Sequence, residues 1–374
     1  MGEESPVHRG LLNFPGEMVP RKLRNTPDSC DRTTVVHNWH DRRSRSTIMG
    51  HLRCMTIAAD DPRLTPIMLR KELLASGHNE KSLAHALRRK DLDRVRWGAY
   101  VSGPTWTTMS EEQRYAVVCR AAYRQARTGV VLSHTSALPF LEAPVWGLRL
   151  DEVHLTRTDE RSGRREAGVR QHSGKLLEGD TVTKYGLTFT NAARAALEVT
   201  TIGSVEAALV VVCDLLHRKL TTPHDLRQRY EETMEQWPYS LRTELVLRLA
   251  DPRIETVGEA RTWHFMWRHS LPKPEPQYEV YDDAGDLVAR LDFALPEWGV
   301  WFEFDGKVKY VRHRKPGESV TDVVLREKGR EGHVSEITGW RCIRITWDDL
   351  ANPERLAARI WKVLLEVRSS RRRP

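Results

Sequence analysis

The sequence predicts an α+β protein built from several domains. At 374 residues the chain exceeds the roughly 100 to 200 residues of a typical domain. Two helical patterns and an alternating hairpin pattern stand near the N-terminus, and three strand patterns separated by tight turns stand near the C-terminus. We expect a small helical domain with a hairpin, a mixed α/β middle region, and a mixed sheet flanked by helices. The expected boundaries are 1–54 for an N-terminal extension, 60–103, 104–250 and 251–366 for the three domains, and 367–374 for a basic tail.

Composition favours a cytoplasmic protein with a polyanionic partner. The longest apolar run, VEAALVVVCDLL at 205–216, is shorter than the roughly 20 residues that span a bilayer, and no apolar signal core follows the N-terminus. The five cysteines are scattered and never form CxxC, which suits a reducing compartment and argues against a zinc site. The net charge of +8 favours a polyanion such as DNA, and we expect no membrane partner.

Residues 1–54 differ from the rest of the chain. They show neither helical nor strand periodicity, and they are rich in Pro, Arg, Ser, Thr and Asn. Such a segment has too little apolar content to order itself. It is either a basic disordered arm that helps to hold nucleic acid or sequence upstream of a true start at Met55. We favour the second interpretation, because TIAADDPRLT reads like a natural N-terminus.

Two helices and a hairpin are expected in the first domain. Helical spacing predicts a first helix over 66–75, which stops where Gly77 can take the left-handed conformation, and a second helix that Asn79 caps. DRVRWGAYVS at 93–102 then alternates like a hairpin that turns at Gly98. This combination predicts a winged helix-turn-helix whose second helix would enter the major groove of DNA. An alternative is a helical packing module with a solvated basic face. The candidate DNA-binding side chains are Lys81, His85, Arg88, Arg89, Lys90 and Arg96.

The middle region carries no clear catalytic motif. A helix is expected over 111–126, followed by short strands and helices. Ser133 and His134 suggest Ser/His catalysis, but no carboxylate has a suitable spacing and no GxSxG elbow is present. We therefore expect Ser133 to be a helix N-cap that accepts from backbone amides. His154 and His172 are interpreted as strand histidines and not as ligands.

The last part of the chain places carboxylates within aromatic strand patterns. Three strands, joined by a turn at DDAGD and a tight loop at PEWG, are expected over 277–282, 287–295 and 300–305. Alternation in the third strand directs Phe302 and Phe304 into the core. Glu303 and Asp305 then point to the opposite face.

The positions of the two turns give an expected register. If Leu295, the last residue before the PEWG loop, pairs with Val300, the first residue after it, then Asp292 lies opposite Glu303. Pairing Asp282 with Leu287 across the first turn places Gln277 opposite Asp292. Because directly opposite side chains share a face, we expect one polar row across the three strands.

This row predicts a divalent-cation site. Carboxylates this close repel and raise one another's pKa, and a cation between them relieves the repulsion. Mg²⁺ or Mn²⁺ is the expected cofactor, with Asp292 and Glu303 as its ligands. Such a cation binds a scissile phosphate, activates water and neutralises charge on the leaving oxygen. An alternative is a solvated salt-bridge network at the strand end.

A resemblance supports the first domain. RLTPIMLRKELLASGHNEKSLAHALRRKDLDRVRWGAYV, at 63–101, resembles the N-terminal winged-helix domain of the AbiEi antitoxins of abortive-infection toxin-antitoxin systems. The resemblance implies DNA binding and makes a cognate toxin a candidate partner. The middle region looks like the segment that joins an AbiEi-like head to a nuclease-like tail in related proteins.

The C-terminal part, over roughly 253–350, resembles the PD-(D/E)XK nucleases, in the branch related to the very short patch repair endonucleases. The resemblance implies a mixed sheet flanked by helices and metal-dependent cleavage of DNA. It also implies a site with Glu259 on the first helix, Gln277, Asp292 and Glu303 on the strands, and a basic cluster of Arg326, Lys328 and Arg330 on the next helix.

One position departs from this superfamily. A lysine is expected two places after the glutamate, where this chain has Asp305. Lys307, Lys309 or Lys328 could act instead; Lys309 is favoured and Lys328 is second. The role of the catalytic lysine would be to stabilise the negative charge on the phosphate or to help deprotonate the attacking water. Two functions follow: a DNA endonuclease in phage defence or DNA repair, or an AbiEi-type antitoxin or transcriptional regulator whose nuclease-like domain is inactive.

Overall fold

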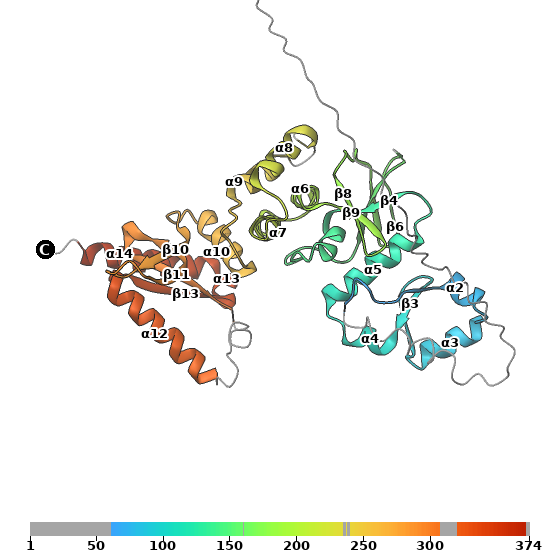
Figure 1. Cartoon of the computed structure of the whole chain (residues 1–374), viewed down its shortest axis with the longest axis horizontal. Helices are drawn as coiled ribbons and strands as arrows, with labels where there is room; N and C mark the ends of the chain where they lie inside the picture. The colour runs from blue at the N-terminus through green and yellow to red at the C-terminus, as the bar shows by residue number, and fades with distance from the viewer. Residues whose placement is uncertain (1–60, 160, 235–236, 238–239, 307–319, 372–374) are drawn as a thin grey trace, which may run out of the picture. The chain divides into compact units, whose positions relative to one another are not determined.

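The computed structural model describes a mixed α/β protein (Figure 1) over residues 61–159, 161–234, 237, 240–306 and 320–371. The predicted extension at 1–54 and the favoured Lys309 lie outside these residues, as does Lys307. The described part of the chain holds three sheets, of three, six and four strands. None of its helices is long and apolar enough to cross a membrane.

The first sheet is a small one that packs with short helices. Its strand order is β1-β3-β2. The elements are β1 (Met68–Leu69), α2 (Arg70–Ala75), α3 (Glu80–Arg88), β2 (Leu92–Arg96), β3 (Ala99–Ser102) and α4 (Gly103–Thr108). Asn79 caps α3 by accepting from the Ser82 amide, and Gly77 and Gly98 have the positive φ angles that the turns require.

The predicted start of the first helix was wrong. The helix begins at Arg70 and not at 66, because Met68 and Leu69 pair with Tyr100 and Ala99 as strand β1. Two residues carry too little periodicity to reveal such a strand, and only the pairing partner on β3 stabilises it.

The middle sheet has six strands in the order β6-β7-β5-β4-β9-β8. Its strands are β4 (Val130–Leu132), β5 (Val153–Arg157), β6 (Arg165–Glu166), β7 (Val169–His172), β8 (Thr181–Lys184) and β9 (Leu187–Thr190). β4 pairs antiparallel with β5 and parallel with β9, and β5 pairs parallel with β7. Segments far apart in the sequence therefore meet at the centre of the sheet.

The helices of the middle region pack on its sheet and on one another. They are α5 (Glu111–Gln125), the 3₁₀ segment η2 (His134–Phe140), α6 (Ala192–Ile202), α7 (Val205–His217), α8 (Pro223–Thr233) and α9 (Ser240–Leu249). The apolar run at 205–216 forms α7, and most of its side chains are buried. A helix that is apolar on all sides is stable only in a core, and α7 occupies such a position.

The C-terminal sheet has four strands in the order β10-β11-β12-β13. Its elements are α10 (Val257–Arg268), β10 (Glu275–Tyr281), β11 (Leu287–Leu295), η3 (Pro296–Trp298), β12 (Val300–Asp305), α12 (Val320–Thr338), β13 (Arg341–Thr346), α13 (Trp347–Ala351) and α14 (Pro353–Ser370). The predicted bounds of β11 and β12 are confirmed, and Gly299 closes the PEWG loop with a φ of 64°. β13 joins β12 in parallel, so the sheet is mixed.

Two apolar clusters cover the faces of this sheet. On one face Phe302 and Phe304 belong to the large core that includes residues of α10, α13 and α14. On the other face Trp301 packs with Val334 of α12. The predicted burial of the two phenylalanines is confirmed. Because helices cover both faces of this sheet with apolar contacts, we expect the polar side chains of a functional site near the ends of its strands.

Candidate active site and histidine cluster

The predicted register holds along most of the C-terminal sheet. β11 pairs with β12 through Leu295–Val300, Ala294–Trp301 and Phe293–Phe302. On the other side β11 pairs with β10 through Pro276–Phe293 and Tyr278–Leu291, among others. The β10–β11 pairs on either side of Gln277 and Asp292 have the predicted register, but these two residues are not themselves a ladder pair, and the β11–β12 ladder ends one step before the predicted Asp292–Glu303 pair.

The assumption about the first turn was wrong. Tyr281, and not Asp282, pairs with Leu287, and the register shifts between Val280 and Tyr281. The cause is the turn itself: the Asp282 carboxylate accepts from the amides of Ala284 and Asp286, which tightens the loop. This bulge lies outside the predicted polar row.

Both strands are irregular where Gln277 and Asp292 meet. Gln277 has a φ of 55°, which is unusual for a residue other than glycine inside a strand. On β11 Leu291 belongs to the cluster that includes α12, whereas Phe293 belongs to the opposite core. Side chains two residues apart share a face in a regular strand, so the alternation is interrupted at Asp292.

Asp292 takes the place of a backbone acceptor at this interruption. Its Oδ2 accepts from the amide of Phe304 at 2.8 Å, just beyond the last β11–β12 ladder pair. The two strands separate there, and the carboxylate occupies the position between them. Such local backbone irregularities gather at functional sites.

Glu259 lies in the first turn of α10 and is almost completely buried. Its Oε2 accepts from the Glu255 amide at 3.0 Å and from Gln277 Nε2 at 3.0 Å, and its Oε1 accepts from the Thr256 hydroxyl at 2.8 Å. Burial, followed by the nearby negative charge of Asp292, raises the pKa of Glu259 to about 7. The structure therefore brings Glu259, Gln277 and Asp292 together.

The other acidic residues of the site contact arginines. Glu303 forms an ion pair with Arg330 of α12. Arg344 of β13 lies 3.7 Å from the Asp305 carboxylate and 2.9 Å from that of Glu331. Arg330 and Arg344 therefore bring positive charge to the predicted acidic positions.

Of the predicted basic residues, Lys328 and Arg326 lie on α12, whose first turns are described by their backbone only. Arg330, on the same helix, reaches the predicted site through its contact with Glu303.

The carboxylates do not form a ready-made set of three ligands. In the described ranges the one group of three ligating side chains with all donor atoms within 4.8 Å consists of histidines. Glu303 is held by Arg330, and Glu259 is held by Thr256 and Gln277. A cation between Asp292 and Glu303 would replace some of these contacts.

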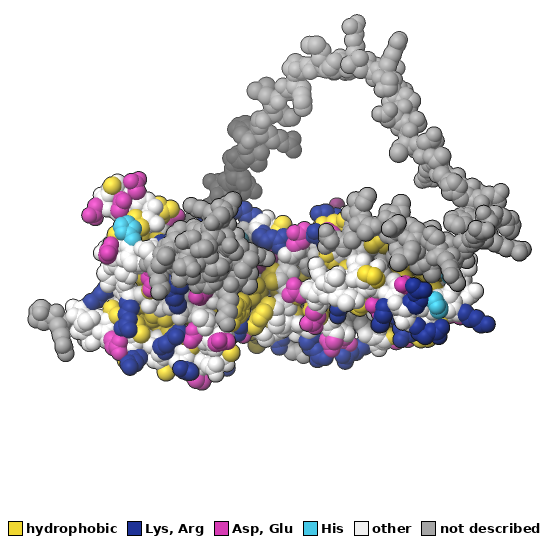
Figure 2. Space-filling model, turned by 90° about the horizontal axis from the view of Figure 1, so that it is seen from below, with side chains coloured by type: hydrophobic (Ala, Val, Ile, Leu, Met, Phe, Trp, Pro, Cys, Tyr) yellow, Lys and Arg dark blue, Asp and Glu magenta, His cyan; other side chains and the backbone are white. Residues whose placement is uncertain are grey.

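Five of the six predicted DNA-binding residues are exposed on or beside α3. Figure 2 shows Lys and Arg side chains gathered over α2 and α3, around a histidine. Lys90 pairs with Asp93, and Arg89 pairs with Asp91, each at 3.2 Å, which offsets part of the positive charge. The exposed members are Lys81, His85, Arg88, Arg89 and Lys90.

Arg96 differs from these five residues. It is half buried at the end of β2, and its Nε lies buried with no hydrogen-bond partner in the described part of the chain. Burial lowers the pKa of Arg96. Of the six candidates, it is the least available for contact with a phosphate.

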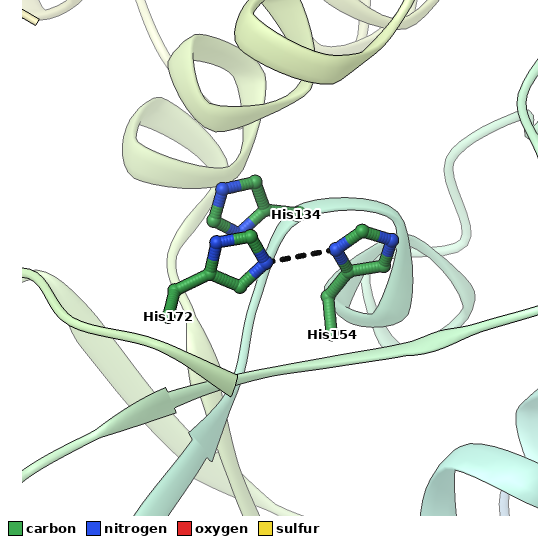
Figure 3. A group of neighbouring side chains, drawn as sticks. All are labelled: His134, His154 and His172. Carbon is green, nitrogen blue, oxygen red and sulfur yellow. Dashed lines mark hydrogen bonds between the residues drawn. The ribbon is translucent and has the colours of Figure 1, made fainter. Parts of the chain in front are cut away.

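Three histidines of the middle region form a cluster that was not predicted (Figure 3). His134 begins η2, His154 lies on β5 and His172 ends β7. His154 Nδ1 and His172 Nε2 are 2.9 Å apart, and the rings of His134 and His172 stack with centroids 3.9 Å apart. The predicted strand positions of His154 and His172 are confirmed.

Polar groups hold His134 in place. Its amide donates to Glu198 Oε2 at 2.9 Å, and its Nδ1 lies 3.0 Å from the Ser133 hydroxyl. Ser133 occupies the N-cap position, but its hydroxyl makes no capping bond, so the predicted N-cap contact with backbone amides was wrong. The hydroxyl contacts the imidazole ring instead.

Burial keeps the cluster uncharged. It lowers the pKa of His154 to about 4 and that of His172 to about 3, and it lowers the pKa of His134 well below 6.5. Glu198, which is buried beside His134, pairs with Arg194 at 2.9 Å. At neutral pH the three imidazoles therefore have lone pairs that are available as ligands or as hydrogen-bond acceptors.

Comparison with known proteins adds no family. No protein-family model matches this chain, and no curated protein matches it. The resemblances to AbiEi antitoxins and to PD-(D/E)XK nucleases remain predictions from its sequence motifs.

Proposed function

We propose that this protein binds DNA through a winged helix-turn-helix and cleaves phosphodiester bonds with its C-terminal sheet. The observation that carries the proposal is the meeting of Glu259, Gln277 and Asp292 where two strands lose their regular alternation. A structural salt-bridge network has no need of a buried acid whose pKa approaches neutrality.

The donor chemistry fits Mg²⁺ or Mn²⁺. Asp292 and Glu303 offer carboxylate oxygens, which hard divalent cations prefer. When bound, such a cation would polarise the phosphate and lower the pKa of a coordinated water.

Glu259 and the nearby arginines would complete the site. Glu259 would ionise as positive charge arrives beside Asp292, because that charge cancels the repulsion between the two acids. Arg330 and Arg344 would stabilise negative charge on the phosphate oxygens, the role that a lysine fills in the superfamily. Lys309 and Lys328 remain candidates for the same role.

The N-terminal part supports DNA binding. An exposed basic helix follows a short turn and precedes a hairpin, which is the element order of a winged helix. Trp97 at the hairpin turn is 83% exposed beside Arg94, so the wing presents an aromatic side chain and a positive one. Contacts of this kind suit the sugar-phosphate backbone.

A plasmid-cleavage assay tests the nuclease proposal. Purified protein is incubated with supercoiled plasmid and Mg²⁺ or Mn²⁺, alongside Asp292→Asn and Glu303→Gln. We expect cutting by the wild type and at least a 100-fold loss in both variants, since each removes a charged ligand. The matched control is Asp283→Asn in the exposed β10–β11 turn, which should cut normally.

A second function is favoured by the arginine contacts of the site. Glu303 and Asp305 are both engaged by arginines, which is an arrangement that an inactive nuclease fold could retain. The alternative is therefore an AbiEi-type antitoxin or transcriptional regulator. Tight binding to its own promoter, with no cutting under either metal, would establish this alternative and exclude the nuclease.

A further inference from the structure

We propose that His134, His154 and His172 form a transition-metal site, with Zn²⁺ as the preferred ion. The site lies in the middle region and uses none of the carboxylates assigned to DNA cleavage. It therefore goes beyond the proposed function, and it holds whether or not the C-terminal sheet cuts DNA.

The spacing of the donors suits a single ion. One ring nitrogen from each histidine lies within 4.8 Å of the other two. Zinc–nitrogen bonds of about 2.1 Å in a tetrahedron place ligand atoms about 3.4 Å apart. The 2.9 Å separation of His154 Nδ1 and His172 Nε2 is close to that spacing, and His134 lies against His172 with ring centroids 3.9 Å apart.

The ligand type selects the class of metal. Three imidazoles favour Zn²⁺ and its transition-metal neighbours, whereas Mg²⁺ and Ca²⁺ take oxygen ligands. Three protein ligands leave a fourth tetrahedral position, which water can fill. His172 is only half buried, so this edge of the cluster is open to solvent, while His134 and His154 are 4% and 5% exposed.

The surroundings of His134 resemble those of a metal ligand. Its backbone has a φ of 53°, a strained value for a residue other than glycine, and its amide is anchored by the buried Glu198. The Ser133 hydroxyl and the Glu198 carboxylate lie 3.0 and 3.7 Å from its Nδ1. Of these two contacts the one with Ser133 is a hydrogen bond, and a bond of this kind fixes the tautomer and orientation of a metal-binding histidine.

Metal binding requires a small rearrangement. Stacked rings hold their lone pairs in nearly parallel planes, so the His134 or His172 ring must rotate about its Cβ–Cγ bond to face the ion. The hydrogen bond between His154 and His172 is then replaced by two metal bonds. The ion would connect η2, β5 and β7, which are three segments of the middle region.

Metal analysis of the full chain, purified without a histidine tag, tests the site. The protein is stripped with EDTA, reloaded with ZnCl₂, dialysed and assayed for zinc by mass spectrometry. Co²⁺ is used in parallel, because tetrahedral Co²⁺ absorbs strongly in the visible range and octahedral Co²⁺ does not. We expect one equivalent of Zn²⁺, a tetrahedral Co²⁺ spectrum, and a higher Tm with Zn²⁺ than with EDTA.

Variants assign the ion to the cluster. His154→Gln and His172→Gln should each lose the bound zinc and the cobalt spectrum. His224→Gln, at a side chain 83% exposed on α8, should keep both. Asp292→Asn should also keep both, which separates this site from the proposed nuclease centre.

A folded wild-type protein that binds neither Zn²⁺ nor tetrahedral Co²⁺ would overturn the proposal, whatever the variants do. The cluster would then be a buried stack of hydrogen-bonded neutral histidines. Unchanged zinc content in both glutamine variants would also overturn it, since the ion would lie elsewhere.

Discussion

At the level of single residues, Glu259 shows how a fold alters the chemistry of an acid. Its carboxylate accepts three hydrogen bonds, which favour the charged form, yet burial and Asp292 outweigh them. Burial removes water from all around the charged carboxylate, whereas each hydrogen bond replaces only one of the lost water contacts. The pKa of Glu259 is therefore raised from its ordinary value of 4.5 to about 7.

Glu259→Gln should change how stability depends on pH. The folded state holds the Glu259 proton more tightly than the unfolded state, so the free energy of unfolding falls as pH rises from about 4.5 to about 7 and then levels off. In the glutamine variant this contribution is absent. Between pH 5 and pH 8 the wild type should lose up to about 3 kcal/mol relative to the variant. Urea unfolding in EDTA at several pH values measures the difference.

The exposed carboxylate of Glu275 at the start of β10 provides the control. For Glu275→Gln the difference from wild type should stay constant over the same pH range. A constant difference for Glu259→Gln as well would show that Glu259 is ionised throughout.

Single residues also show what sequence reasoning can and cannot find. The Asp292 and Glu303 positions follow from turn chemistry, because short hairpin loops set the register of strands that are close in the chain. The meeting of His134, His154 and His172 depends on the parallel pairing of β5 with β7 and on the path of η2. No local pattern encodes such pairing. The sequence offered two histidines on expected strands, His154 and His172, and a third, His134, next to the expected helix N-cap at Ser133.

At the level of elements, the packing of α10 on the C-terminal sheet depends on Gly258. A Cβ at this position would lie 2.0 Å from the ring of Phe304. Phe304 cannot easily move, because it is buried and makes an edge contact with Trp347 at 4.8 Å between centroids. The absence of a side chain lets the start of α10, and therefore Glu259, approach the strand.

Gly258→Ala should destabilise the protein although alanine favours helices. The helix propensity gain is at most about 1 kcal/mol. Overpacking against a buried ring costs about 1 to 3 kcal/mol, so we expect a net loss. Gly332→Ala on α12 is the matched control, because its new Cβ would meet nothing within 4 Å, and it should be neutral or stabilising. Thermal unfolding of both variants compares the two effects, and a more stable Gly258→Ala protein would contradict this packing.

Elements were predicted unevenly, for physical reasons. The bounds of β11 and β12 are right because aromatic and β-branched runs end at Gly and Pro turns. α5 follows from its helical pattern. The two-residue β1 was missed, since so short a strand depends on its tertiary partner.

At the level of the whole molecule, the chain has a net charge of +8, and exposed basic side chains on α3 contribute to it. Lys81 and Arg88 are exposed there and take part in no ion pair within the described ranges, unlike Arg89 and Lys90. Unpaired surface cations are the ones best placed to displace counterions from DNA.

Lys81→Ala and Arg88→Ala should weaken DNA binding in a salt-dependent way. Under the proposed function each substitution removes one phosphate contact, so the slope of log K against log[salt] should become shallower by about one. Fluorescence anisotropy with a labelled duplex at several salt concentrations gives the slope. Lys362→Ala on α14, a side chain 78% exposed, is the control and should leave the slope unchanged. Equal slopes for all four proteins would place the DNA contact away from α3.

The pairing of strands in the six-stranded middle sheet affects how the chain folds during its synthesis. Leu132 on β4 pairs with Phe189 on β9, so its central contact closes only after a long intervening stretch has been synthesised. Non-local pairings of this kind form late and slowly. Until β9 has been synthesised, the nascent chain exposes apolar strand edges. A chaperone that shields these edges during translation should therefore raise the yield of native protein.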